Sequence, residues 1–105
     1  MVSIDGNGLT LEDVVRVARH GEPVELSPEG IEAVETSRKH LESVIASGNP
    51  VYGINTGFGI FADRRIPRRD SAALSRNLIL SHAVGTGEPL PAEVVRAAML
   101  VRANT

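Results

Sequence analysis

Two short stretches near the start of the chain alternate between apolar and polar residues. The first is 2–4, before a polar and glycine-rich turn at 5–8, and the second is 23–26. Alternation with a period of two predicts strands whose apolar side chains all lie on one buried face. We expect the two stretches to pair as a small two-stranded ribbon, which needs further packing because a lone pair of strands is only marginally stable.

The residues between these strands carry the apolar spacing of a helix. Thr10 and Asp13 have the separation of a capping box, in which each side chain bonds the backbone of the other residue. Gly21 follows as the expected stop. The position of His20 needs no functional explanation, because a cation is favourable near the negative end of the helix dipole. The expected buried face consists of Leu11, Val14, Val15 and Ala18.

Two further helices are predicted in the middle of the chain. Ser27 and Pro28 are typical of an N-cap and a first helical residue, and the helix they start is expected to end at 48–50. Its apolar stripe is Ile31, Val34, Leu41, Val44 and Ile45, while His40 lies off this stripe and is interpreted as a solvated side chain. Asp70 or Ser71 can cap a third helix that ends at 85–87. That helix runs through Leu74, Leu78, Ile79 and His82.

The last predicted helix, from Pro91 onward, is apolar nearly all round, with Arg96 and Arg102 as the chief interruptions. Such a helix is expected to be buried on most sides, yet few residues follow that could cover it. We therefore expect a piece of something larger. The predicted fold class is α+β and mainly helical, with a two-stranded ribbon and about four helices in one domain over 1–105.

Composition narrows the function classes. The net charge of −2 and the isoelectric point near 5.9 give no electrostatic footprint for nucleic acid. The arginines at 64, 65, 68 and 69 are interpreted as a solvated or subunit-contacting loop. No apolar run is long enough for a membrane span, and no leader precedes the first strand. The chain has no cysteine, which is compatible with a cytoplasmic protein, and no metal-ligand spacing is found.

The segment from Val51 to Gly59 combines the only tyrosine, Tyr52, with three glycines. Gly53, Gly57 and Gly59 predict turns with positive φ, or backbone that lies close against another group. They would also serve as hinges for a loop that carries a general acid or base. Residues 57–62 match a dinucleotide-binding Gly-x-Gly-x-x-Ala pattern, but Pro67 interrupts the helix that this pattern requires.

The sequence Tyr-Gly-Ile-Asn-Thr-Gly-Phe-Gly at 52–59, followed by Asn-Leu-Ile-Leu-Ser-His-Ala-Val-Gly-Thr-Gly at 77–87, resembles the amino-terminal region of the histidine ammonia-lyases. These enzymes belong to the aromatic amino acid lyase family. The resemblance runs from about residue 9 to the end of the chain. It implies that the chain is the opening part of an enzyme that eliminates ammonia from L-histidine to give urocanate.

The resemblance also implies roles for two residues. Tyr52 matches the catalytic tyrosine that removes the β-proton, and a free tyrosine is a poor base unless a neighbour stabilises its phenolate. Asn55 and Thr56 would hold the local turns through side-chain hydrogen bonds. His82 falls on the position that meets the substrate side chain. Read from spacing alone, His82 is instead a histidine packed in the core.

The family's electrophile is 4-methylidene-imidazol-5-one (MIO), made from an Ala-Ser-Gly of the chain itself, and its members are tetramers. We expect these residues to contain no Ala-Ser-Gly precursor and the MIO-forming segment to lie outside them, so that this chain alone is inactive. Neither a metal nor a nucleic acid partner is expected. Two alternatives stay open: a lyase or aminomutase for another aromatic amino acid, and a stand-alone binding module that never forms the electrophile.

Overall fold

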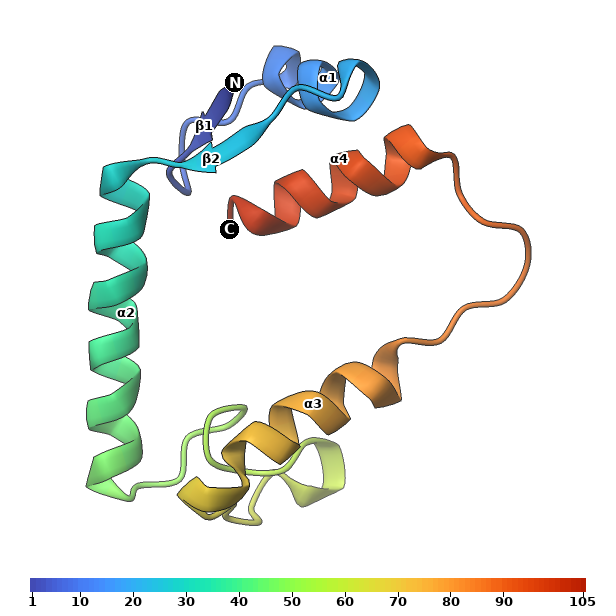
Figure 1. The fold of residues 1–105 in the computed structure, drawn as a ribbon. Helices are drawn as coiled ribbons and strands as arrows, with labels where there is room; N and C mark the ends of the chain where they lie inside the picture. Colours follow the sequence, from blue (N-terminus) through green and yellow to red (C-terminus); the bar gives the residue numbers. More distant parts are fainter. The chain divides into compact units, whose positions relative to one another are not determined.

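The computed structural model describes all 105 residues, and they form two compact units. The first unit comprises 1–36 and 88–105, and the second comprises 37–87. In order, the elements are β1 (Val2–Ile4), α1 (Leu11–His20), β2 (Val24–Leu26), α2 (Pro28–Ser47), η1 (Gly59–Phe61), η2 (Arg68–Asp70), α3 (Ser71–His82) and α4 (Ala92–Ala103) (Figure 1). The predicted fold class, mainly helical with a two-stranded sheet and four α-helices, is confirmed.

The two strands of the first unit pair in parallel, with Val2 opposite Val24 and Ile4 opposite Leu26. A parallel pair requires a crossover connection, and α1 supplies it. The predicted ribbon is therefore one small β-α-β unit. Its strand β1 is covered, since Val2 and Ile4 are buried, whereas the residues of β2 are exposed.

Local capping signals set the bounds of α1 and the start of α2. The Asp13 backbone amide donates to Thr10 Oγ1 and the Thr10 amide donates to Asp13 Oδ2, both at 3.2 Å, which is the predicted capping box. Gly21 closes α1 with φ 67°. The hydroxyl oxygen of Ser27 accepts the amide hydrogen of Gly30 at 3.0 Å, so Ser27 caps α2 as expected.

The core of the first unit is formed by Val2, Ile4 and Leu100. Leu9, Val14 and Val17 pack against it. The predicted face of α1 is thus wrong at one end, because Leu11 is 82% exposed. Leu9, just before the helix cap, supplies the apolar contact instead. Val15 was also assigned to that face and is 39% exposed.

Helix α4 lies beside α1 in this unit (Figure 1). Arg19 Nε donates to Glu93 Oε2 at 2.8 Å across the two helices, and the amide of Gly6 donates to Asn104 Oδ1 at 3.1 Å. Leu100 is buried, but Met99 is 67% exposed. The covering expected around this apolar helix is therefore not supplied by these residues.

Glu22 gathers the charges at one edge of the first unit. Its carboxylate accepts hydrogen bonds from the guanidinium of Arg16 and from the terminal ammonium of Met1. These bonds, that of Arg16 foremost, lower the pKa of Glu22 to about 2. Because the charges face solvent, the group is a surface network and not a buried one.

The second unit contains the carboxyl-terminal part of α2, an irregular segment with two 3₁₀ turns, and α3. Leu74 and Leu78 are half-buried, whereas Ile79 is 68% exposed. Helix α3 ends at His82, before the predicted stop at 85–87. Asp70 occupies its N-cap position, but the carboxylate makes no capping hydrogen bond. None of the helices is both long and apolar enough to cross a membrane.

Candidate functional site

The tyrosine segment is a series of turns. The amides of Ile54 and Asn55 donate to the carbonyl oxygen of Val51 at 3.1 and 3.3 Å, which closes a turn around Tyr52 and Gly53. Gly53 has φ 78°, a conformation that favours glycine. The Tyr52 side chain is 63% exposed. The fold therefore presents the only tyrosine at the tip of a turn.

Two buried polar residues anchor this turn. Asn55 and Thr56 are 5% and 1% exposed. Asn55 Oδ1 accepts from the Val51 amide at 2.7 Å, and its Nδ2 donates to the Asn49 carbonyl at 2.8 Å. Thr56 Oγ1 accepts from the Gly53 amide at 3.3 Å. The expectation that Asn55 and Thr56 hold the local turns is confirmed.

The other two glycines have different structural reasons. Gly59 adopts φ 58° at the start of η1. Gly57 has no positive φ, but a Cβ atom there would lie 2.7 Å from both the Cβ and the carbonyl oxygen of Phe61. Both predicted explanations, positive φ and close approach, thus occur in one segment. Because residues 59–61 form a single 3₁₀ turn, the dinucleotide-binding pattern lacks its helix.

Phe58 connects the tyrosine to a hollow on the surface of the second unit. Its ring meets that of Tyr52 edge to face, with centroids 5.8 Å apart and planes at 71°. Phe58 also lines a hollow of about 500 Å³ that contains His82 in its wall. The remaining lining residues are Gly57, Phe61, Arg64, Ile66, Leu74, Asn77, Leu78 and Ser81. Tyr52 does not line this hollow itself and adjoins it only through its contact with Phe58.

His82 is the last residue of α3, and its side chain is exposed. The reading in which it packs in the core does not describe its place within this chain. Its Nδ1 lies 2.9 Å from the carbonyl oxygen of Leu78 and 2.9 Å from Ser81 Oγ. The ring is thus oriented by its own helix.

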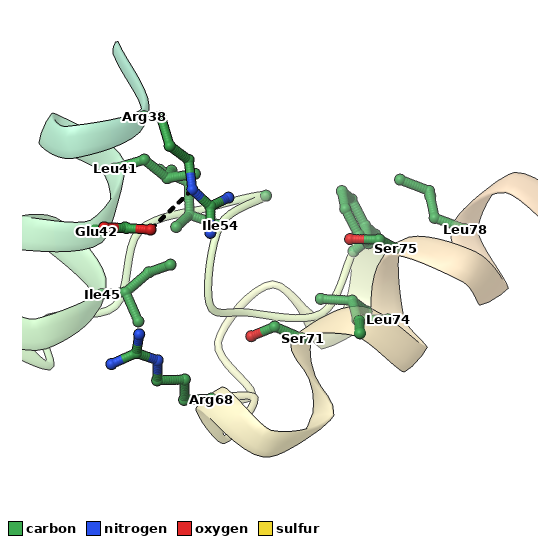
Figure 2. A pocket seen from close by; sticks show the side chains of 13 residues that line it. Arg38, Leu41, Glu42, Ile45, Ile54, Arg68, Ser71, Leu74, Ser75 and Leu78 are labelled. Atoms are coloured by element: carbon green, nitrogen blue, oxygen red, sulfur yellow. Dashed lines mark hydrogen bonds and ion pairs between the residues drawn. The ribbon is translucent and has the colours of Figure 1, made fainter. Parts of the chain in front are cut away.

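A second hollow, of about 450 Å³, lies between the carboxyl-terminal part of α2 and α3 (Figure 2). Phe58, Leu74 and Leu78 line both hollows. Arg38 and Glu42 are its charged residues on α2, and they pair with each other at 3.0 Å. Gly53 lines this second hollow, but neither Tyr52 nor His82 does, so we place the candidate site at the hollow that contains His82.

The arginine-rich segment does not form one cluster around a ligand. The guanidinium of Arg64 stacks over the ring of Phe61 at 4.8 Å, and Arg69 Nε lies 3.7 Å from the carboxylate of the adjacent Asp70. Arg68 lines the second hollow. Each of these arginines therefore has a separate environment, in agreement with a surface loop.

The tripeptide Ala-Ser-Gly does occur in the chain, at 46–48, and the expectation that these residues contain no such precursor is wrong as a statement about sequence. Ala46 and Ser47 form the last turn of α2, and Gly48 ends it with φ 74°. Ser47 Oγ donates to the Val44 carbonyl at 2.7 Å, and the Gly48 amide donates to the Ile45 carbonyl at 3.2 Å.

If MIO formed from residues 46–48, their backbone would have to leave the helix end and close into a ring. In this structure the Gly48 nitrogen is instead engaged, through its hydrogen, with the carbonyl of Ile45 in the helix terminus. The tripeptide has the features of an ordinary helix end with glycine after the last turn. Residues 46–48 therefore do not fit the cofactor, and we derive no chemical step through MIO here.

Sequence reasoning did not identify two residues of the site. Phe58 was quoted within the motif, but its contact with Tyr52 depends on the turn geometry. Ser81 was quoted beside His82, and its contact with the ring follows from the rotamer at the end of α3. In both cases the only sign in the sequence was that the residue belongs to one of the two motifs.

The fold and the site have clear relatives. The sequence profile of the aromatic amino acid lyase family matches residues 9–105, and the chain belongs to this family. It is 55% identical over 104 residues to the histidine ammonia-lyase of Geobacillus sp. strain WCH70, a match that covers 99% of this chain and 20% of the relative. The chain spans about a fifth of the length of the curated relatives it matches.

Enzymes with other activities share this fold. The ergothioneine-degrading enzyme ergothionase from Treponema denticola superposes with a TM-score of 0.92 at 38% identity, covering 98% of this chain and 21% of that one. A tyrosine aminomutase superposes with a TM-score of 0.91 at 32% identity, covering 98% and 20%. The fold is therefore shared among enzymes of different substrates.

Proposed function

We propose that these residues are the amino-terminal part of a histidine ammonia-lyase, which eliminates ammonia from L-histidine to give urocanate. The observation that carries the choice of substrate is the 55% identity to a curated histidine ammonia-lyase over nearly the whole chain. Identity to ergothionase and to the tyrosine aminomutase is lower, at 38% and 32%. The alternatives, another aromatic amino acid or a binding module, have no comparable support.

In this proposal Tyr52 is the general base that removes the β-proton of the substrate. Its exposed position at the tip of a turn allows its oxygen to approach a molecule bound outside the unit. The side-chain hydrogen bonds of the segment involve Asn55 and Thr56 and do not engage the Tyr52 hydroxyl. The Tyr52 hydroxyl has no partner within these residues, so in this proposal the donor that stabilises its phenolate comes from another part of the longer protein.

His82 is proposed to bind the substrate side chain. An exposed imidazole in the wall of a hollow can form a hydrogen bond with the imidazole of L-histidine. A phenyl side chain would leave this group without its partner, a loss of about 1–3 kcal/mol when the group is desolvated. This difference supports histidine over phenylalanine.

The proposed enzyme needs further parts that these 105 residues do not supply. We infer that MIO forms in another part of the longer protein, since residues 46–48 end a helix. Of the three predicted hinges, Gly53 is proposed to permit movement of the tyrosine loop, since Gly57 lies against Phe61 and Gly59 begins η1. A cytoplasmic homotetramer, in which one subunit's Tyr52 can serve a neighbour's site, completes the proposal.

The test is an elimination assay with the purified longer protein that contains these residues. We would compare kcat/KM for L-histidine, followed by urocanate absorbance, with kcat/KM for L-tyrosine and L-phenylalanine and with consumption of ergothioneine. A clear preference for L-histidine is expected. Preferential turnover of any of the other three would refute the choice of substrate and leave the family assignment intact.

A further inference from the structure

The hydrogen bonds around His82 determine which of its ring nitrogens carries the proton. Nδ1 lies 2.9 Å from the carbonyl oxygen of Leu78. A carbonyl can only accept, so a neutral imidazole in this position needs its hydrogen on Nδ1. The alternative, a ring with Nδ1 unprotonated, would place two lone pairs against each other at hydrogen-bonding distance.

The Ser81 hydroxyl completes this arrangement. Ser81 Oγ donates its only hydrogen to the same Leu78 carbonyl at 2.9 Å, and it lies 2.9 Å from Nδ1 of His82. With that hydrogen already used, Oγ faces Nδ1 with a lone pair. Both neighbours of Nδ1 are then acceptors, and they favour the same tautomer.

We propose that Ser81 and the Leu78 carbonyl hold neutral His82 as its Nδ1–H tautomer, so that Nε2 is presented as a hydrogen-bond acceptor for a ring N–H of the substrate. Ser81 is thus a positioning residue that acts through His82. This inference rests on the proposed function, in which His82 meets the substrate side chain. The side chain of L-histidine always carries a ring N–H, and a phenyl ring carries none.

The orientation of the hydrogen bond makes the site selective in a specific way. An Nε2 that accepts requires a donor on the ligand, so the two N-methylhistidines, whose neutral rings have no N–H, lose this bond. An Nε2–H that donates would need only a ring lone pair, and each N-methyl isomer retains one. The tautomer therefore decides whether substitution at either ring nitrogen is tolerated.

The first experiment measures the tautomer directly by ¹⁵N NMR of the ring nitrogens in the chain labelled at histidine. The chain has three histidines, and His20 and His40 are internal controls because neither ring nitrogen pair is held by a hydrogen bond. His82→Gln identifies the His82 signals by their disappearance. We expect a pyrrole-type Nδ1 and a pyridine-type Nε2 at His82 alone, and a change toward the pattern of the controls in Ser81→Ala. A His82 ring that matches the controls, or is unaffected by Ser81→Ala, would overturn the proposal.

The second experiment measures the consequence in the longer protein. Ser81→Ala should raise KM for L-histidine by about 2- to 10-fold with little change in kcat, the scale of one modest hydrogen bond, and Ser81→Thr should restore it. Ser75→Ala is the matched control, a serine-to-alanine change on α3 away from the ring. The inhibition constants of both N-methylhistidines should be larger than the KM for L-histidine. Equal KM values for the variants at 81 and 75 would refute the positioning role.

The two experiments separate this inference from the proposed function. If NMR confirms the tautomer but the longer protein prefers another amino acid, the choice of substrate fails and the tautomer assignment stands. If the protein turns over L-histidine but His82 carries its hydrogen on Nε2, the proposed function stands and this inference fails.

Discussion

The close contact at Gly57 makes a strong prediction about the tyrosine segment. In Gly57→Ala the new methyl group would lie 2.7 Å from Phe61 Cβ and 2.7 Å from the Phe61 carbonyl oxygen. Favourable carbon–carbon contacts are about 3.5–4.0 Å, so the methyl group is about 1 Å too close. The atoms it meets are backbone or next to it, and a rotamer change of Phe61 cannot remove them.

The turn around Gly57 has little freedom to open. The Gly57 amide donates to the Arg64 carbonyl at 2.9 Å, and the Arg64 amide donates to the Phe61 carbonyl at 2.9 Å. Overpacking costs about 1–3 kcal/mol, and breaking one of these hydrogen bonds adds about 1 kcal/mol. Alanine recovers about 0.4–1 kcal/mol by restricting the unfolded chain. We expect a net destabilisation of about 1–3 kcal/mol.

Urea unfolding of the chain, followed by near-ultraviolet circular dichroism of Tyr52, tests this expectation. Tyr52 is the only tyrosine and no tryptophan is present, so the signal reports the segment itself. Gly85→Ala is the control, because no atom lies within 4 Å of the added methyl group and its φ is not positive. If the variants at 57 and 85 unfold at the same urea concentration with the same tyrosine signal, the close-contact argument is wrong.

Four further predictions concern chemistry and charge. Tyr52→Phe in the longer protein should lower kcat at least ~10²-fold with a smaller change in KM, the scale of a positioned base; an unchanged kcat would make the tyrosine a packing residue. His82→Leu should lower kcat/KM for histidine roughly 5- to 150-fold and affect phenylalanine less, and equal losses on both substrates would contradict substrate contact. The isolated chain should show no urocanate formation and an intact mass equal to its sequence, because residues 46–48 end a helix; a mass lower by two water molecules would show that MIO forms there. Glu22→Gln should reduce the loss of stability between about pH 4.5 and 2. The lowered pKa of Glu22 stabilises the fold at pH values above the ordinary carboxylate pKa, and this contribution is lost as the pH falls through about 2. Urea midpoints whose pH dependence is the same in the variant and the parent chain would refute this.

Local signals in the sequence predicted the element bounds where the relevant contacts are local. The capping box of Thr10 and Asp13 and the stop at Gly21 involve atoms within one turn, so residue types alone are sufficient. Asp70 has the right residue type at an N-cap, yet its side chain makes no capping bond. The parallel pairing of β1 and β2 follows from the helix between them, once both strands are accepted.

Which apolar residues become buried could not be predicted in the same way. Leu11 and Val17 are both apolar positions of α1, but only Val17 packs against the core. The choice depends on where β1 and Leu100 meet the helix, which periodicity does not specify. For His82, periodicity placed the residue near the apolar face, while the structure places its exposed ring on the Leu78 carbonyl.

The glycine segment shows how far residue types can specify the backbone of an irregular loop. The sequence predicted positive φ or close approach without distinguishing the positions, and the structure assigns the first to Gly53 and Gly59 and the second to Gly57. Gly57 is buried against Phe61, so movement there would disturb the turn that follows. Gly53 lies in the exposed turn closed by the Val51 carbonyl, beyond the buried anchor Thr56.

Movement of the tyrosine is therefore most easily confined to the turn at 51–54. The amide of Ile66 donates to the Asn55 carbonyl at 2.7 Å and fixes the base of the segment from the other side. Tyr52 can change its position by rotation at Gly53 if the 3.3 Å bond from the Gly53 amide to Thr56 Oγ1 opens, while Asn55 keeps its bonds to Val51 and Asn49. If Tyr52 is the base, as proposed, such a turn would give it a movable tip on a rigid support, because the buried polar groups would lose their partners if the whole segment moved.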